Sequence, residues 1–171
     1  NLTFESYDVA TGIGADSVTG TYLALENVGS FDIVSQGAIS GNRSLKVTNT
    51  GYTWATRLFY VNRFGSMIKN GETYRMSFSV KTNGATLISA EVRMTEAHHN
   101  ADAFLADFRY KITNDEQGNP ISVGIDLTGW TGAAQKYTNG NCYIDEDGII
   151  RVSFDFFVPA DAALAEDIPN V

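Results

Sequence analysis

The chain is poor in cysteine, in basic residues and in long apolar runs, and each shortage excludes a class of protein. Cys142 is the only cysteine among 171 residues, so neither an internal disulfide nor a cysteine-based zinc site can form. Lys and Arg number 12 against 20 Asp and Glu, a formal net charge of −8. No basic face is therefore expected that would bind nucleic acid or an anionic membrane surface. The longest apolar runs are four or five residues, whereas a membrane-spanning helix needs about 20.

The rest of the composition is typical of one folded domain. Apolar residues make up 43% of the chain and charged residues 19%, which suits a hydrophobic core and argues against disorder. The chain begins at Asn1, without Met and without a basic-plus-apolar leader, so we expect a mature or excised fragment. A surface rich in Thr, Asn and Gly and poor in Lys suits an extracellular bacterial module, so we expect a secreted or cell-surface location.

Alternation of apolar and polar side chains predicts β-strands along most of the chain. Over 72–81 the apolar positions fall on one face and the polar positions on the other, as in a strand with one face in a core. The same pattern recurs over 88–95 and most clearly over 150–158. Shorter strands are expected at 2–5, 31–35, 44–49, 53–61, 104–113, 121–127 and 142–144.

Turn-forming sequences such as Asn-Gly and Asp-Gly separate these runs. About ten short strands with such spacing predict an all-β sandwich or barrel. Helical periodicity is weak, with one helical turn expected within 97–106 and another within 160–166. No internal repeat or linker is evident, so one domain over 1–171 is expected. Its predicted core contains Leu45, Val47, Tyr74, Met76, Phe78, Val80, Val152, Phe154 and Phe156.

Four segments carry a resemblance to a known family, in order and over nearly the whole chain. They are Asn-Leu-Thr-Phe-Glu at 1–5, Ile-Ser-Gly-Asn-Arg-Ser-Leu-Lys-Val at 39–47, Ile-Lys-Asn-Gly-Glu-Thr-Tyr-Arg-Met-Ser-Phe-Ser-Val-Lys at 68–81, and the strand at 151–160. Together they resemble the jelly-roll carbohydrate-binding modules related to families 4, 9, 16 and 22. The resemblance implies a jelly-roll β-sandwich of two antiparallel sheets. The family closes with an aromatic-Ile-Asp-Asp strand where this chain ends at 167–171, so we expect a truncated or divergent last strand.

The resemblance also implies non-catalytic binding of a polysaccharide or oligosaccharide. Aromatic rings in such sites stack on the apolar face of a sugar, while polar side chains bind its hydroxyls. Trp54 matches the family's binding-face position, and the residues two positions away, Tyr52 and Thr56, are not those of a buried strand. The predicted ligand-binding residues are Tyr52, Trp54, Arg57, Trp130 and Tyr137. The outward Arg75, Glu91 and Arg93 would line the same surface or be merely solvated.

A structural calcium ion is a further implication of the resemblance. In the family, such an ion joins the first strand, the Ser-Gly strand and a terminal Asp. Carried over to this chain, Glu5 supplies a carboxylate, and Thr3 and Asn42 supply main-chain oxygens. Calcium prefers such mixed oxygen ligands.

Two other groups of residues could suggest metal sites, but their sequences favour ordinary loops and turns. His98 and His99 lie between Glu96 and Asp102, but adjacent histidines in a strand point to opposite faces and the chain has no third histidine. The acidic segments 114–118 and 145–148 lack the spacing of an EF-hand and fit hairpin turns.

No nucleophile elbow of the Gly-x-Ser-x-Gly type is present, so no catalytic residue is predicted. We therefore expect a monomeric module of a longer chain, appended to a secreted carbohydrate-active enzyme such as a glycoside hydrolase, or to a surface protein. The alternatives are an adhesion or spacer sandwich without a sugar site, and a glycan-degrading enzyme on the same fold. Such an enzyme would need a pair of carboxylates, and the geometry of the strands would set the distance between them.

Overall fold

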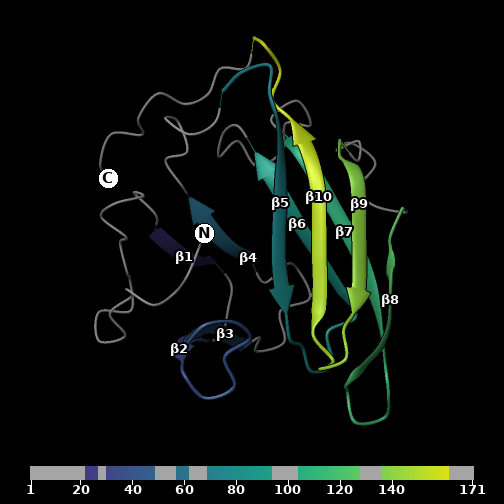
Figure 1. Cartoon of the computed structure of the whole chain (residues 1–171). Helices are drawn as coiled ribbons and strands as arrows, with labels where there is room; N and C mark the ends of the chain where they lie inside the picture. The colour runs from purple at the N-terminus through teal and green to yellow at the C-terminus, as the bar shows by residue number, and fades with distance from the viewer. Residues whose placement is uncertain are drawn as a thin grey trace. The chain divides into compact units, whose positions relative to one another are not determined.

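The computed structural model describes residues 22–26, 30–48, 57–61, 69–93, 104–127 and 136–161. These residues form ten strands and no helix, and every strand pairing among them is antiparallel (Figure 1). The all-β prediction is thus confirmed. The chain divides into two compact units, Asn1–Ser66 and Met67–Val171, and each is described by itself.

The first unit contains two strand pairs. β1 (Tyr22–Glu26) pairs with β4 (Arg57–Val61), and β2 (Ser30–Val34) pairs with β3 (Ser44–Thr48). At the start of β3, the Ser44 hydroxyl accepts a hydrogen bond from the Ile39 amide over 2.8 Å. The β1 strand is not among the predicted ones, because its sequence Tyr-Leu-Ala-Leu-Glu shows no apolar–polar alternation and contains good helix formers.

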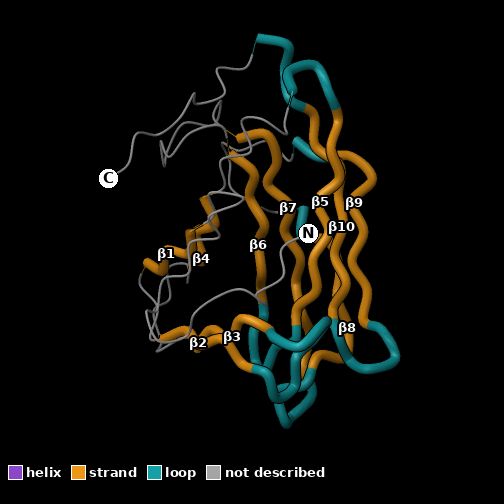
Figure 2. The backbone as a smooth tube through the Cα atoms, turned by 60° about the vertical axis from the view of Figure 1, so that its left-hand side comes forward, coloured by secondary structure: helices purple, strands orange, loops and turns teal. Residues whose placement is uncertain are grey.

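The second unit contains two three-stranded sheets (Figure 1). One has the order β5 (Thr73–Val80), β10 (Ile150–Phe157), β9 (Thr138–Ile144). The other has the order β6 (Leu87–Arg93), β7 (Phe104–Asn114), β8 (Pro120–Ile125). β8 and β9 approach each other where the two sheets meet at one edge (Figure 2).

A hydrophobic core joins the two sheets of this unit, and its most buried side chains come from β7, β10 and the residue after β10. They are Leu105, Ala106, Phe108, Tyr110, Ile112, Ile150, Val152, Phe154, Phe156 and Val158. The predicted core positions of β10 are therefore confirmed. Those of β5 are half-buried and pack against the same cluster, while Leu45 and Val47 are half-buried in β3. The contribution of β7 was not predicted.

The predicted strand over 104–113 is confirmed, and it includes the last three residues of the segment where a helical turn was expected. A helical turn was expected within 97–106, but residues 104–106 already belong to β7, and 97–103 lie outside the described residues. The inward positions Ala106, Phe108 and Tyr110 continue one alternating run, which is the pattern of a strand with one face in the core. Of the second expected helical turn, only 160–161 are described, and they lie in a turn.

Two hairpins, β7–β8 and β9–β10, close with the same turn built on an aspartate. Asp115 Oδ1 accepts hydrogen bonds from the amides of Gln117 and Asn119 at 2.9 and 2.8 Å. Asp145 Oδ1 accepts from Asp147 and Ile149 at 3.0 and 2.9 Å. Gly118 and Gly148 follow with φ of +86° and +74°, a conformation that favours glycine. The two acidic segments are hairpin turns, as predicted, and each of these two carboxylates binds its own backbone.

Candidate functional site

The structure describes the side chain of one predicted sugar-binding residue, Tyr137. Tyr52, Trp54 and Trp130 lie outside the described residues, and Arg57 is described only as backbone at the start of β4. The Tyr137 ring meets Phe108 edge-on with centroids 4.8 Å apart, so it packs on the core while remaining half-buried. Burial, together with the nearby Asp107 and Cys142, raises the pKa of its phenol. Its role in sugar binding stays a prediction.

The structure describes one of the three predicted calcium ligands. Thr3 and Glu5 lie outside the described residues, while Asn42 lies in the exposed turn between β2 and β3. Within the described ranges, no three His, Cys, Asp or Glu side chains gather in a way that could hold a metal ion. The histidine pair at 98–99 is also outside these ranges. The calcium site stays a prediction.

The outer surface of the β5–β10–β9 sheet presents an organised set of polar side chains, which we name the polar face. Strand alternation turns these side chains away from the core, and the register aligns them across the three strands. The polar face comprises Thr73, Arg75, Ser77, Ser79, Asn139, Asn141, Tyr143, Arg151, Ser153, Asp155 and Phe157.

One row of the polar face is centred on Arg151. Its neighbours in register are Ser79 on β5 and Tyr143 on β9. Arg151 Nη1 donates to Ser79 Oγ over 2.7 Å, and Arg151 Nε donates to Asp145 Oδ2 over 2.7 Å. The guanidinium is thereby fixed between Ser79 on β5 and Asp145 in the β9–β10 turn. On the other side of the row, Tyr143 is 51% exposed.

A second row is centred on Asp155. Arg75 donates to it twice, from Nε to Oδ1 over 2.6 Å and from Nη2 to Oδ2 over 3.0 Å, and Asn139 Nδ2 donates to Oδ2 over 2.7 Å. A bidentate guanidinium–carboxylate pair fixes both partners in direction as well as distance. These bonds, chiefly that from Arg75, lower the pKa of Asp155 to about 2. Asp155 is therefore ionised at neutral pH.

A β-bulge places Asn139 in this second row. The β9–β10 register shifts between Ser153 and Asp155, and Asn139 takes a left-handed φ of 50°. The next residue, Gly140, lies against the core: a Cβ there would be 2.5 Å from Cε2 of Phe108 and 2.6 Å from Cε2 of Tyr137. The bulge thus aims an amide outward and needs a residue without a side chain at position 140.

Small residues lie between the two rows. Ser77, Ser153 and Asn141 are neighbours in register there. A shallow depression of about 290 Å³, which we name the serine groove, is lined by Ser77, Phe78, Ser79, Tyr143, Arg151, Val152 and Ser153. It combines hydroxyl groups, a fixed guanidinium and an exposed phenol ring. This set of groups suits an uncharged polyhydroxylated ligand that also has an apolar face.

The charges that build the polar face compensate one another. Arg75 is paired with Asp155, and Arg151 is paired with Asp145. Hydrogen bonds from the Ile149 amide and from Arg151 lower the pKa of Asp145 as well. A glycosidase needs a general acid with a raised pKa, so these two carboxylates are unsuited to that role.

The charged surface of β7 is a different kind of site. Arg109 bonds Asp107 with Nη2 and Oδ2 2.9 Å apart, and Lys111 Nζ lies 3.3 Å from Asp126 Oδ1. Asp107 is only 1% exposed and Asp126 is also buried. A ligand from solution would not reach Asp107 without displacing what covers it, so we do not assign a binding role to this cluster.

The sequence pattern predicts only part of the polar face. Alternation placed Arg75 and Arg151 on the outward side of their strands, but Tyr143 and Asn139 were not identified. The available signal was the outward alternation at 139, 141 and 143, whereas the predicted strand covered only 142–144.

No family model, curated protein or solved structure matches the chain. The function of the polar face is therefore inferred from its own chemistry. No helix capable of crossing a lipid bilayer occurs among the residues that the structure describes.

Proposed function

We propose that the chain is a non-catalytic module that binds a polysaccharide or oligosaccharide, with the serine groove as a contact site. The observation that carries the proposal is the half-exposed Tyr143 ring beside a guanidinium fixed by Ser79 and Asp145. A pyranose can stack its apolar C–H face on such a ring and present its hydroxyls to Arg151 and to the serines. Trp54 and Trp130 stay predicted as additional platforms.

Prior fixation of the polar groups favours binding. Side chains that are mobile in the free protein lose rotamer entropy when a ligand orders them, about 0.5–1.5 kcal/mol for each. Arg151 and Arg75 are already held by hydrogen bonds to aspartates. The polar face therefore loses less entropy on binding than a surface of solvated side chains would.

The fold and cellular context belong to the same proposal. We propose a jelly-roll β-sandwich of two antiparallel sheets, in line with the shared core of the two sheets in Met67–Val171. A structural calcium ion bound by Thr3, Glu5 and Asn42 would support its N-terminal part. The module would be secreted or displayed on the cell surface, where it holds an attached enzyme at its polymeric substrate and raises the local enzyme concentration.

A polysaccharide panel tests this function. The protein is run through native gels containing xylans, β-glucans, mannans or pectins, with Tyr143→Ala and Ile121→Ala run beside it. Ile121 is a matched control because it is an exposed apolar residue on β8, outside the polar face.

Retardation by at least one neutral polysaccharide is expected, lost or weakened in Tyr143→Ala and kept in Ile121→Ala. Trp54→Ala and Trp130→Ala in the same gels test the other predicted platforms. No retardation by any polysaccharide would support a spacer or adhesion module instead, and release of soluble sugar from the panel would show an enzyme.

A further inference from the structure

A second exposed aromatic ring lies on the polar face, at the opposite end from Tyr143. Phe157 ends β10 and is 54% exposed. It faces outward with Arg151, Ser153 and Asp155, because positions two apart in a strand share a face. Its partner in register on β5 is Thr73, whose short side chain belongs to the same face.

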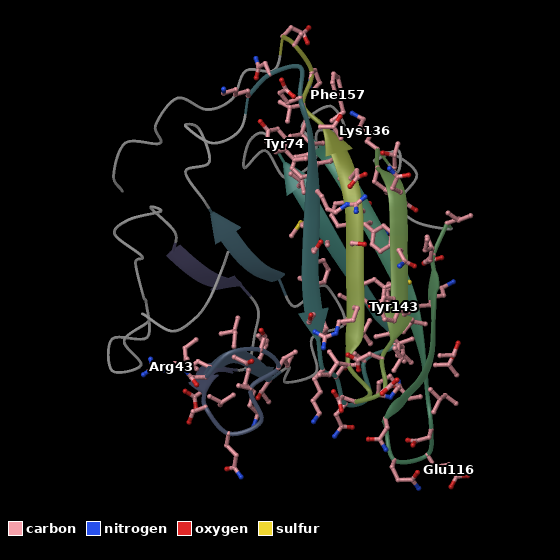
Figure 3. All side chains as sticks on the ribbon, viewed as in Figure 1. Arg43, Tyr74, Glu116, Lys136, Tyr143 and Phe157 are labelled. Carbon is pink, nitrogen blue, oxygen red and sulfur yellow. The ribbon has the colours of Figure 1, made fainter. Side chains whose placement is uncertain are left out.

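The spacing between the two rings suits a ligand of several sugar units. Tyr143 is opposite Arg151 in register, and Phe157 lies six residues further along β10. At 3.3–3.4 Å per residue the two rows are roughly 20 Å apart. Figure 3 shows Tyr143 and Phe157 toward opposite ends of the sheet.

Hydrogen-bonding groups fill the space between these rings. The serine groove adjoins Tyr143, and the Arg75–Asp155–Asn139 row lies next to Phe157 along β10. The Arg75 side chain is 60% exposed, although it is ion-paired, so part of its guanidinium faces solvent. Along β10 the face therefore presents an aromatic ring, then hydroxyl groups, then an ion pair, and finally a second aromatic ring.

We infer that an uncharged linear oligosaccharide lies along β10 and contacts both rings, with Phe157 and Thr73 as a second subsite. This inference rests on the proposed function and adds the direction, length and charge of the ligand. An uncharged ligand is assigned because both arginines of the face are already neutralised by aspartates and the chain carries a formal net charge of −8. An anionic glycan would gain little attraction from such a surface.

A length series tests the second subsite. Oligosaccharides of increasing length, prepared from the polysaccharide that retards the protein, are titrated calorimetrically into the wild type, Phe157→Ala, Phe157→Tyr and Tyr143→Ala. Wild-type affinity is expected to rise with length until the ligand reaches both rings. Phe157→Ala should lose that rise, by about tenfold for the longest ligands, and should bind the shortest ligands as the wild type does. Phe157→Tyr keeps the ring and should keep the rise.

The outcomes separate this inference from the proposed function. If Phe157→Ala matches the wild type at every length, or loses affinity equally at every length, the second subsite is wrong while glycan binding stands. If the wild type binds no oligosaccharide of the series, the proposed function itself fails. Tighter binding of a uronic-acid series of matched lengths would overturn the assignment to uncharged ligands. An unchanged melting temperature of Phe157→Ala, expected for an exposed ring, confirms that the comparison is between folded proteins.

Discussion

Phe108 of β7 stacks on Phe154 of β10, with ring centroids 5.2 Å apart and ring planes inclined by 12°. Both side chains are fully buried, and Tyr137 packs edge-on against Phe108. Because the two strands belong to different sheets, this contact joins the sheets at the centre of the core. The outward side chains of β10 belong to the polar face, and the inward side chains of the same strand fix it on the core.

Replacing Phe154 with Ala should destabilise the protein by about 3–5 kcal/mol, because the variant leaves a cavity under the stacked ring of Phe108. Chemical denaturation followed by intrinsic fluorescence measures the change. Phe157→Ala is the matched control on the same strand, and its exposed ring should contribute within about 0.5 kcal/mol. Equal stability of the two variants would contradict the inward and outward assignment of β10.

Gly140→Ala should destabilise the protein by about 1–3 kcal/mol, since the added methyl group would overlap the rings of Phe108 and Tyr137. Gly124→Ala is the control. It lies in β8, where an added Cβ meets no atom within 4 Å, and Ala weakens a strand less than Gly does. Thermal unfolding of both variants should show a lower melting temperature for Gly140→Ala and an unchanged or higher one for Gly124→Ala. A neutral Gly140→Ala variant would mean that the bulge is not packed against the core.

Acid should remove the stability that Asp155 contributes. Its pKa falls from an ordinary 3.8 to about 2 in the folded protein, so between these values the unfolded chain binds more protons than the folded one. Stability from this group is complete above about pH 5 and is lost as the pH falls toward 2. Denaturation midpoints at pH 2–5 should fall less steeply in Asp155→Asn than in the wild type. Parallel curves for the two proteins would show that Asp155 is not ion-paired.

How far the fold could be predicted depends on how regularly each strand faces the core. β5 and β10 were predicted almost to the residue, because one face is apolar and the other polar over the whole strand. β1 was missed because it lacks that alternation. Asp107 shows a different limit: its outward position on β7 predicts exposure, yet it is buried, and burial of an outward face depends on what packs over it.

The polar face could be predicted only in part. Alternation identified Arg75 as outward, but its bidentate partner Asp155 lies 80 residues away, and only the β5–β10 register brings them together. Asn139 reaches Asp155 through a bulge, which shifts register by one residue and leaves no clear signal in the sequence. The sequence predicted Trp54 and Trp130 as aromatic platforms. Tyr143 becomes a candidate only in the structure, where it lies beside Arg151.

Removal of calcium tests the metal prediction. If Thr3, Glu5 and Asn42 hold an ion, excess chelator should lower the melting temperature without abolishing the folded state, because the second unit has its own core. Differential scanning calorimetry before and after chelation measures this, and Glu5→Gln should lose the calcium dependence. An unchanged melting temperature in a protein purified without detectable metal would contradict the site.

The most direct test of glycan binding at the polar face is a backbone NMR titration with an oligosaccharide from the polysaccharide that retards the protein. The largest shift changes should fall at Tyr143, Arg151 and Ser153, with β8 residues such as Ile121 unaffected, and Tyr143→Ala should weaken the titration. No shift changes at any residue, or changes confined to residues outside the polar face, would contradict the assignment.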